Sequence, residues 1–272
     1  MNLDPTQPIL CFDFDGTLLD ENENVHPADL TFLTEPQDYI RVASTGRTLE
    51  SVRRVFAKNG LFVDQTIPFP MILMNGGAVF GFNEERVSDI HFTPKLLDKV
   101  TTNLPLEDDV TYLFMGLRES LLLTPTEYAV SACTRYELGY RYINNLDEIN
   151  IPIIKVMAFS RNLNTLAVID STFKQYPVEG VYSMPTIYEI TPQGINKGKG
   201  LHHLIEGLNL KPKMTIAAGD GGNDLPLLNE VDYAFAPHHA SAEVLTQVQY
   251  RFEREPNGIF ASILATMVEI LS

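Results

Sequence analysis

The stretch ILCFDFDGTLLD, residues 9–20, ends an apolar run with two aspartates one residue apart, followed directly by a Gly-Thr pair. A short apolar run closed by a glycine turn is typical of a strand buried on both faces of a parallel sheet. Side chains alternate along a strand, so we expect Asp13 and Asp15 to converge on one side while Phe14 points into the core. Two carboxylates about 4 Å apart repel by about 4 kcal/mol at an effective dielectric near 20. A divalent metal, or a proton on one carboxylate, would offset this repulsion; the alternative is a strand end turning into solvent, because Asp-Gly is a common turn signal.

The bulk composition narrows the class of protein. The 272 residues, 44% apolar and 20% charged, predict a globular protein of one to two domains. A net charge of −15 argues against a nucleic-acid partner, because binding a phosphate backbone needs a basic surface. With no basic leader and no run near eighteen apolar residues, we expect a soluble cytoplasmic protein with no membrane partner. Cys11 and Cys133 are far apart and predict buried thiols.

Strand and helix patterns alternate at both ends of the chain. Strands are predicted in residues 9–14, 39–44, 71–75, 214–220 and 233–237, and helices in 48–60, 197–210, 224–230 and 258–271. Thr48 is a suitable N-cap and Gly60 a suitable stop for the first of these helices. The alternation predicts an α/β fold, a doubly wound Rossmann-like parallel-sheet core built from residues 1–83 and 186–272.

The middle of the chain has a different pattern. Residues 84–185 give mixed strand pairs and helices, which predict a separately folded α+β insertion between the two halves of the core.

A second acidic group lies in AAGDGGNDLPLL, residues 217–228. Asp220 follows a predicted buried strand, at the edge where ligands bind in an open α/β sheet. Gly221 and Gly222 would permit a tight turn there. Asp224 precedes a helical pattern, so its alternative role is that of a helix N-cap.

Two further strand ends carry groups suited to phosphate. In VASTGRTLE, Thr45 offers a hydroxyl and Gly46 an unhindered N–H ahead of a helix N-terminus, although Thr45 and Thr48 also suit simple turn and cap roles. In ITPQGINKGKGL, Lys197 begins a predicted helix, where the helix dipole does not favour a cation, so an anionic partner is indicated. The segment lacks P-loop spacing.

The ordered set DFDGT, STGR, a helix-starting Lys and GDGGND resembles the haloacid dehalogenase superfamily of aspartyl-phosphate phosphatases. NGG at residues 75–77, EITPQGINKGKGL and the late PNGIF resemble more narrowly its Cof-type members, which carry a C2-type (IIB) cap after the second motif. The resemblance covers residues 9–83 and 186–263.

The resemblance implies a Mg2+-dependent phosphatase acting on a small phosphorylated metabolite, a sugar phosphate or a cofactor phosphate. It implies that residues 84–185 form a substrate-specificity cap and that the protein is a monomer or weak homodimer. It also implies site roles: Asp13 as nucleophile; Asp15 as general acid and base; Thr45 and Lys197 as phosphoenzyme stabilisers; Gly16, Gly46, Arg47, Asn75 and Asn223 as phosphate binders; and Asp13, Asp15, Asp220 and Asp224 as metal ligands.

One turn departs from the family pattern. Where these proteins usually carry a Met-Gly-Asn-Ala-like turn, this chain reads APHHA, residues 236–240. His238 and His239 are therefore either new contacts or surface turn residues, and we expect the surface role. Two other functions stay open: a phosphosugar mutase of the same superfamily, and a non-catalytic phosphate-binding protein.

Overall fold

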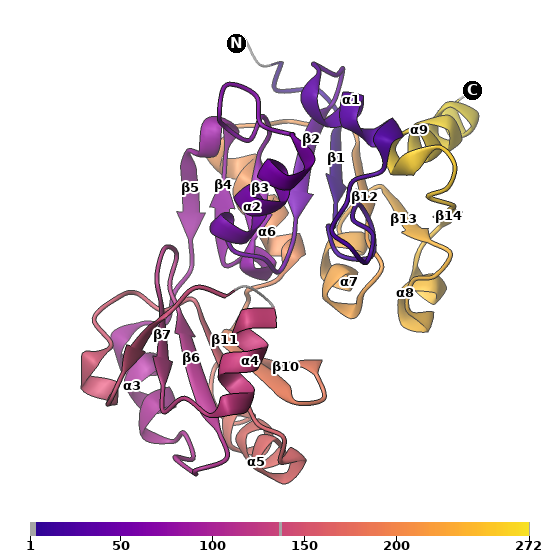
Figure 1. The fold of residues 1–272 in the computed structure, drawn as a ribbon. Helices are drawn as coiled ribbons and strands as arrows, with labels where there is room; N and C mark the ends of the chain where they lie inside the picture. Colours follow the sequence, from indigo (N-terminus) through magenta and orange to yellow (C-terminus); the bar gives the residue numbers. More distant parts are fainter. Residues whose placement is uncertain (1–3, 136–137, 272) are drawn as a thin grey trace. The chain divides into compact units, whose positions relative to one another are not determined.

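The computed structural model describes residues 4–135 and 138–271, which form two compact units. The core unit comprises the chain up to Ser88 together with the chain from Asn196 onward. The inserted unit is the continuous segment Asp89–Ile195. Each unit has its own sheet and its own hydrophobic core (Figure 1).

The core unit is built on an eight-stranded sheet with the order β14-β13-β12-β1-β2-β3-β4-β5. The run from β14 to β3 is parallel, and β4 pairs antiparallel with β3. The strands are β1 (Ile9–Phe12), β2 (Ile40–Ser44), β3 (Met71–Leu73), β4 (Ala78–Phe80), β5 (Arg86–Asp89), β12 (Thr215–Ala218), β13 (Tyr233–Pro237) and β14 (Tyr250–Phe252). Because β1, β2 and β12 are parallel neighbours, the residues that follow them meet at one edge of the sheet.

Helices connect these strands. They are α1 (Leu30–Thr34), α2 (Leu49–Asn59), α6 (Lys197–Gly207), α7 (Leu225–Leu228), α8 (Ala242–Gln247) and α9 (Gly258–Leu271), with 3-10 turns η1 (Pro27–Asp29), η2 (Met74–Gly76), η3 (Phe82–Glu84) and η5 (Gly222–Asp224). As predicted, Thr48 caps α2 by accepting a hydrogen bond from the Ser51 N–H, and Gly60 ends the helix.

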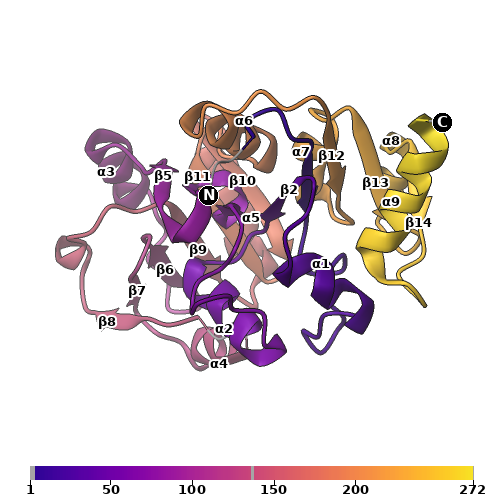
Figure 2. The ribbon, with the colours of Figure 1, turned by 90° about the horizontal axis from the view of Figure 1, so that it is seen from above.

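Side chains of β1 alternate between the two faces of the sheet, and both faces are buried. Ile9 and Cys11 pack with residues of α6, α7 and α8. Phe12 instead packs its ring edge-on against Phe69 and Phe260, the latter in α9. Figure 2 shows α6 and α7 on the side of the sheet opposite α1 and α2. The core unit is therefore the predicted doubly wound α/β fold.

The inserted unit contains a six-stranded sheet with the order β10-β11-β9-β6-β7-β8. The strands are β6 (Thr111–Met115), β7 (Ser120–Leu123), β8 (Arg141–Ile143), β9 (Lys155–Phe159), β10 (Val178–Met184) and β11 (Ile187–Pro192); the helices are α3 (Pro94–Thr102), α4 (Glu127–Arg135) and α5 (Leu163–Phe173), with η4 (Leu146–Glu148). Buried residues of α3 and α5 share one core with β6, β7, β9 and β11.

The inserted unit begins at Asp89 and the core unit resumes at Asn196, whereas the sequence pattern predicts these two starts at residues 84 and 186. The sequence EITPQGINK links the strand β11 directly to Lys197, so the motif suggested that the core restarts before β11. The structure instead pairs β11 with β9 and β10 inside the inserted unit, and the core unit resumes at Asn196. Within the described residues, no helix has the length and apolar character needed to cross a membrane.

Candidate active site

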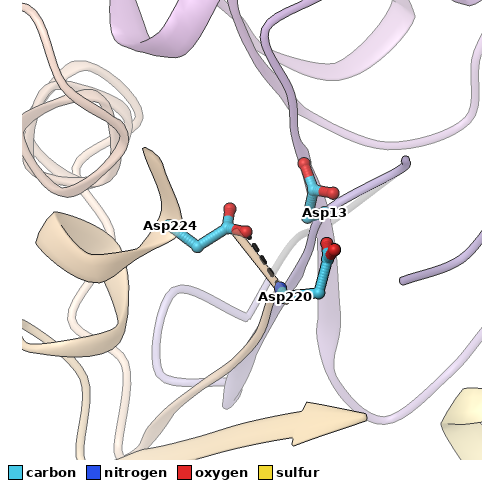
Figure 3. A group of neighbouring side chains, drawn as sticks. All are labelled: Asp13, Asp220 and Asp224. Carbon is cyan, nitrogen blue, oxygen red and sulfur yellow. Dashed lines mark hydrogen bonds between the residues drawn. The ribbon is translucent and has the colours of Figure 1, made fainter. Parts of the chain in front are cut away.

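Three aspartates gather at the carboxyl edge of the core sheet (Figure 3). Asp13 follows β1, Asp220 follows the neighbouring β12, and Asp224 ends the turn η5. One carboxylate oxygen from each lies within 4.8 Å of the others. Asp13 and Asp224 are buried, with relative exposures of 4% and 0%. The parallel pairing of β1 with β12 thus brings together acidic residues more than 200 positions apart in the sequence.

Asp224 organises the loop that carries Asp220. Its Oδ2 accepts hydrogen bonds of 3.0 Å from the backbone N–H groups of Asp220 and Gly221. Asp224 precedes α7, but its side chain makes no capping bond to that helix. The N-cap alternative is therefore not what the structure shows, and the carboxylate faces the acidic cluster instead.

Two glycines allow the acidic segments to approach each other. Gly16 has φ +84°, and a Cβ there would lie 2.3 Å from the Asp220 carboxylate. Gly219 is restricted by space alone, because a Cβ there would lie 2.5 Å from the Asp224 side chain. The expected turn glycine Gly222 has open space around it, with a first neighbour at 4.0 Å.

Lys197, the first residue of α6, lies between two of the aspartates. Its Nζ is 2.5 Å from Asp13 Oδ1 and 2.5 Å from Asp224 Oδ1, and its side chain is fully buried. The ammonium group balances one of the cluster's three negative charges. This placement accounts for a cation at a helix N-terminus, where the helix dipole alone would disfavour it.

The burial of these groups shifts their protonation. Burial raises the pKa of the Asp13 carboxyl well above its ordinary value; Lys197 opposes the shift, and the Asp224 and Asp220 carboxylates add to it. Burial, with Asp224, also raises the pKa of Asp220, against the hydrogen bond from the Thr17 hydroxyl. Burial alone would lower the pKa of Lys197, but its two aspartate partners raise it. Without a further cation, the pocket therefore favours protons on Asp13 and Asp220.

Asp15 does not join this cluster. Its carboxylate is 58% exposed and is held by Arg47, whose Nε lies 2.8 Å from Oδ2. Arg47 also contacts Glu23, at 2.7 Å, and Ser51. The expected convergence of the Asp13 and Asp15 side chains rested on strand alternation. The strand ends at Phe12, however, so the alternation does not extend to Asp15.

The groups expected to bind phosphate lie on neighbouring loops of the same edge. Thr45 is fully buried after β2, and its carbonyl accepts the Asn75 N–H. Asn223 donates a 3.2 Å hydrogen bond from its side-chain amide to Asn75 Oδ1. Gly46 faces the same amide, because a Cβ there would lie 3.1 Å from Asn75 Oδ1. The segments STGR, NGG and GDGGND are thus joined by side-chain and backbone contacts.

The family model for haloacid dehalogenase-like hydrolases matches residues 10–261. The chain belongs to this family. A Bacillus subtilis relative, YxeH, whose name marks it as a candidate phosphatase, is 27% identical to this hydrolase over 266 residues, 89% of this chain and 92% of YxeH. The crystal structure of TM0651 from Thermotoga maritima has a TM-score of 0.81 at 25% identity, with 98% of both chains covered.

A subclass IIB sugar phosphatase of the same superfamily also shares the fold, with a TM-score of 0.74 at 20% identity over 96% of this chain and 98% of its own. Family membership and the phosphatase names of the relatives agree with the motifs. The chain is a haloacid dehalogenase-like hydrolase whose curated and structural relatives include proteins named as phosphatases.

Sequence reasoning did not identify three contacts of the hydrolase's site. Thr17 donates its hydroxyl to Asp220 Oδ1 at 3.2 Å, and Glu23 binds Arg47. His239, expected on the surface, is exposed but places Nε2 2.8 Å from the carbonyl oxygen of Gly16. His238 matches the surface expectation, with its side chain 51% exposed. The unusual APHHA turn was the signal for His239, although it did not separate the two histidines.

The donor set of the site fits Mg2+. Asp13, Asp220 and Asp224 offer only carboxylate oxygens, the ligand type that magnesium prefers. Their three negative charges exceed the single positive charge of Lys197 by two, which a divalent cation would balance. Burial first, and then the neighbouring carboxylates, raise the pKa of Asp13 and of Asp220, and a bound cation would oppose both effects.

Proposed function

We propose that this phosphatase hydrolyses a small phosphomonoester, a sugar phosphate or a cofactor phosphate, through a phosphoenzyme on Asp13. One observation carries the proposal. The buried Asp13 carboxylate is paired with the buried ammonium group of Lys197 and lies beside two further carboxylates at the carboxyl edge of a parallel sheet. Nucleophilic catalysis needs such a positioned group with neighbouring charges that stabilise the transferring phosphoryl.

In the first half-reaction, an Asp13 carboxylate oxygen attacks phosphorus and the bond from phosphorus to the leaving oxygen breaks. Asp15 supplies the proton that the leaving oxygen takes up. Lys197 contacts Asp13 directly, so its ammonium group stabilises the negative charge that gathers around the transferring phosphoryl.

In the second half-reaction, water attacks phosphorus and gives its proton to Asp15. The bond from phosphorus to Asp13 then breaks, which releases phosphate and restores the carboxylate. We propose that Thr45 and Gly46, with Asn75 and Asn223 beside them, bind phosphate oxygens at the carboxyl edge of the sheet. The guanidinium group of Arg47 binds Asp15, so we assign it to orienting that group.

Asp13, Asp220 and Asp224, with the backbone carbonyl of Asp15, are the groups that would hold Mg2+. When bound, the ion would supply positive charge that screens the carboxylates and polarises a phosphoryl oxygen.

The inserted unit, Asp89–Ile195, is proposed to act as the cap that selects the leaving group. Replacing it with a short linker should leave activity toward small unspecific phosphates and remove the selectivity.

The test is a phosphate-release screen across sugar and cofactor phosphates. We expect turnover with Mg2+, none in excess EDTA, and recovery when Mg2+ is returned. Calcium should inhibit, because its larger and looser oxygen shell would misplace the nucleophile. Asp13→Asn should abolish turnover. Full activity in EDTA would contradict the metal assignment, and an isomerised sugar phosphate without free phosphate would identify a mutase instead.

A further inference from the structure

The turn from His238 to Ser241 contacts both segments that carry the acidic cluster. His239 Nε2 lies 2.8 Å from the carbonyl oxygen of Gly16, in the loop that follows Asp13. The Ser241 N–H donates a 2.9 Å hydrogen bond to the backbone carbonyl of Asp220. One short turn is therefore bonded to the loops of two proposed metal ligands.

The direction of the histidine hydrogen bond follows from its partner. A carbonyl oxygen only accepts, so Nε2 must carry a hydrogen. Both the neutral Nε2–H form and the protonated ring of His239 meet this condition. The contact with Gly16 therefore persists whether the ring is neutral or charged.

The Gly16 peptide depends on a hydrogen-bond partner to fix its orientation more than the peptide of another residue type would. Its backbone adopts φ +84°, and glycine has the widest choice of backbone conformations. It also lies against the Asp220 carboxylate, and the next residue, Thr17, donates its hydroxyl to that carboxylate. A change in the orientation of the Gly16 peptide would therefore alter how the Asp13 loop meets Asp220.

We infer that His239 is a positioning residue for the metal site: by holding the Gly16 carbonyl, it fixes the loop after Asp13 against Asp220 and so sets the spacing of the oxygen ligands. The inference rests on the proposed function, because it concerns the Mg2+ site of that reaction. It gives the APHHA turn a role that the family pattern does not supply, since a histidine here reaches the loop through its side chain.

The test compares His239→Ala, His239→Asn and His239→Gln with wild type. Gln and Asn carry the same amide donor, but only Gln is long enough to place it where Nε2 lies. His238→Ala is the matched control, because His238 is the preceding residue and its side chain is exposed. Thermal unfolding is followed as MgCl2 is added in the absence of substrate, since an ion that binds the folded state raises the unfolding temperature.

We expect His239→Ala and His239→Asn to need about three- to tenfold more Mg2+ than wild type for the same rise in unfolding temperature, the range equivalent to one hydrogen bond. His239→Gln and His238→Ala should behave like wild type. In turnover assays His239→Ala and His239→Asn should need more Mg2+ than wild type but approach the wild-type kcat when Mg2+ is saturating. A purely structural role would instead lower the unfolding temperature in EDTA and leave the Mg2+ dependence unchanged.

If wild type responds to Mg2+ and His239→Ala responds at the same concentrations, the inference about His239 is refuted and the proposed function stands. If wild type shows no response to Mg2+, the metal site of the proposed function falls and the inference falls with it. Should His239→Ala fail to fold, the comparison of His239→Gln with His239→Asn decides the question.

Discussion

Arg47 binds both side-chain oxygens of Asp15, with Nε 2.8 Å from Oδ2 and a terminal nitrogen 2.5 Å from Oδ1. Burial alone would lower the pKa of Arg47, but its hydrogen bonds to Asp15 and Glu23 raise it. The guanidinium group is therefore a permanent cation anchored by a second carboxylate. It holds Asp15 in one orientation beside the loop of the proposed nucleophile.

Removing this anchor should slow proton transfer. We expect Arg47→Met to reduce kcat for a sugar phosphate by about tenfold, which is the rate equivalent of one charge-assisted hydrogen bond. Asp15→Asn should cost more, about 10²- to 10⁴-fold, because the acid-base group itself is lost. An aryl phosphate has a better leaving group and should be less affected in the first step. Equal losses for both substrates would argue against an effect through Asp15.

Asp13→Asn should stabilise the metal-free protein, and the gain should grow with pH. The folded-state pKa of Asp13 is raised, so its folded carboxyl holds a proton more tightly than in the unfolded chain. The associated stability is fully present below the unfolded pKa of about 4 and is lost as the pH rises through the folded value. Unfolding temperatures of wild type and variant in EDTA, from pH 4 to pH 8, measure this difference. A constant difference across that range would contradict the prediction.

Lys197→Met should destabilise the core unit at neutral pH by about 3–5 kcal/mol, because it leaves two buried carboxylates without their cation. Lys199→Met is the matched control, since Lys199 is an exposed lysine on the same helix. Urea unfolding in EDTA gives the free energies. Added Mg2+ should recover part of the loss, whereas activity should stay low because the phosphoryl loses its buried cation.

Gly219→Ala should disrupt the acidic cluster, whereas Gly222→Ala should have little effect. A Cβ at Gly219 would lie 2.5 Å from the Asp224 side chain, while at Gly222 the first neighbour is 4.0 Å away. The displaced Asp224 carboxylate would release the Asp220 N–H and shift Lys197. Mg2+-dependent thermal shifts of the two variants test this contrast, and equal shifts would refute it.

The fold could be predicted because its elements carry local signals. The apolar run of β1, the Thr48 cap and the Gly60 stop each act within a few residues. Strands β8 and β14 escape such reasoning, since each has only three residues and, unlike the equally short β3, does not lie in a continuous apolar run. The start of the core after the insertion was also missed, because the choice of a partner strand for β11 is a tertiary property.

The site could be predicted where strand ends, or the helix that begins at Lys197, define it. The carboxyl ends of parallel strands share one edge, which places Asp13 near Asp220 and Thr45 from topology alone. The positions of Asp15 and His239 depend instead on the paths of loops. No periodic pattern reports those paths, so the Arg47 contact and the Gly16 contact emerged only from the structure.

The order of strands in the core sheet also bears on synthesis. On one side β1 pairs with β2, but its partner on the other side, β12, is synthesised more than 200 residues later, after the whole continuous segment Asp89–Ile195. We expect that segment to fold first, while the edge of β1 that pairs with β12 in the folded protein is still unpaired. Unpaired strand edges invite intermolecular pairing. Nascent chains halted between residues 196 and 214 should therefore be the species that chaperones bind and that aggregates during overproduction.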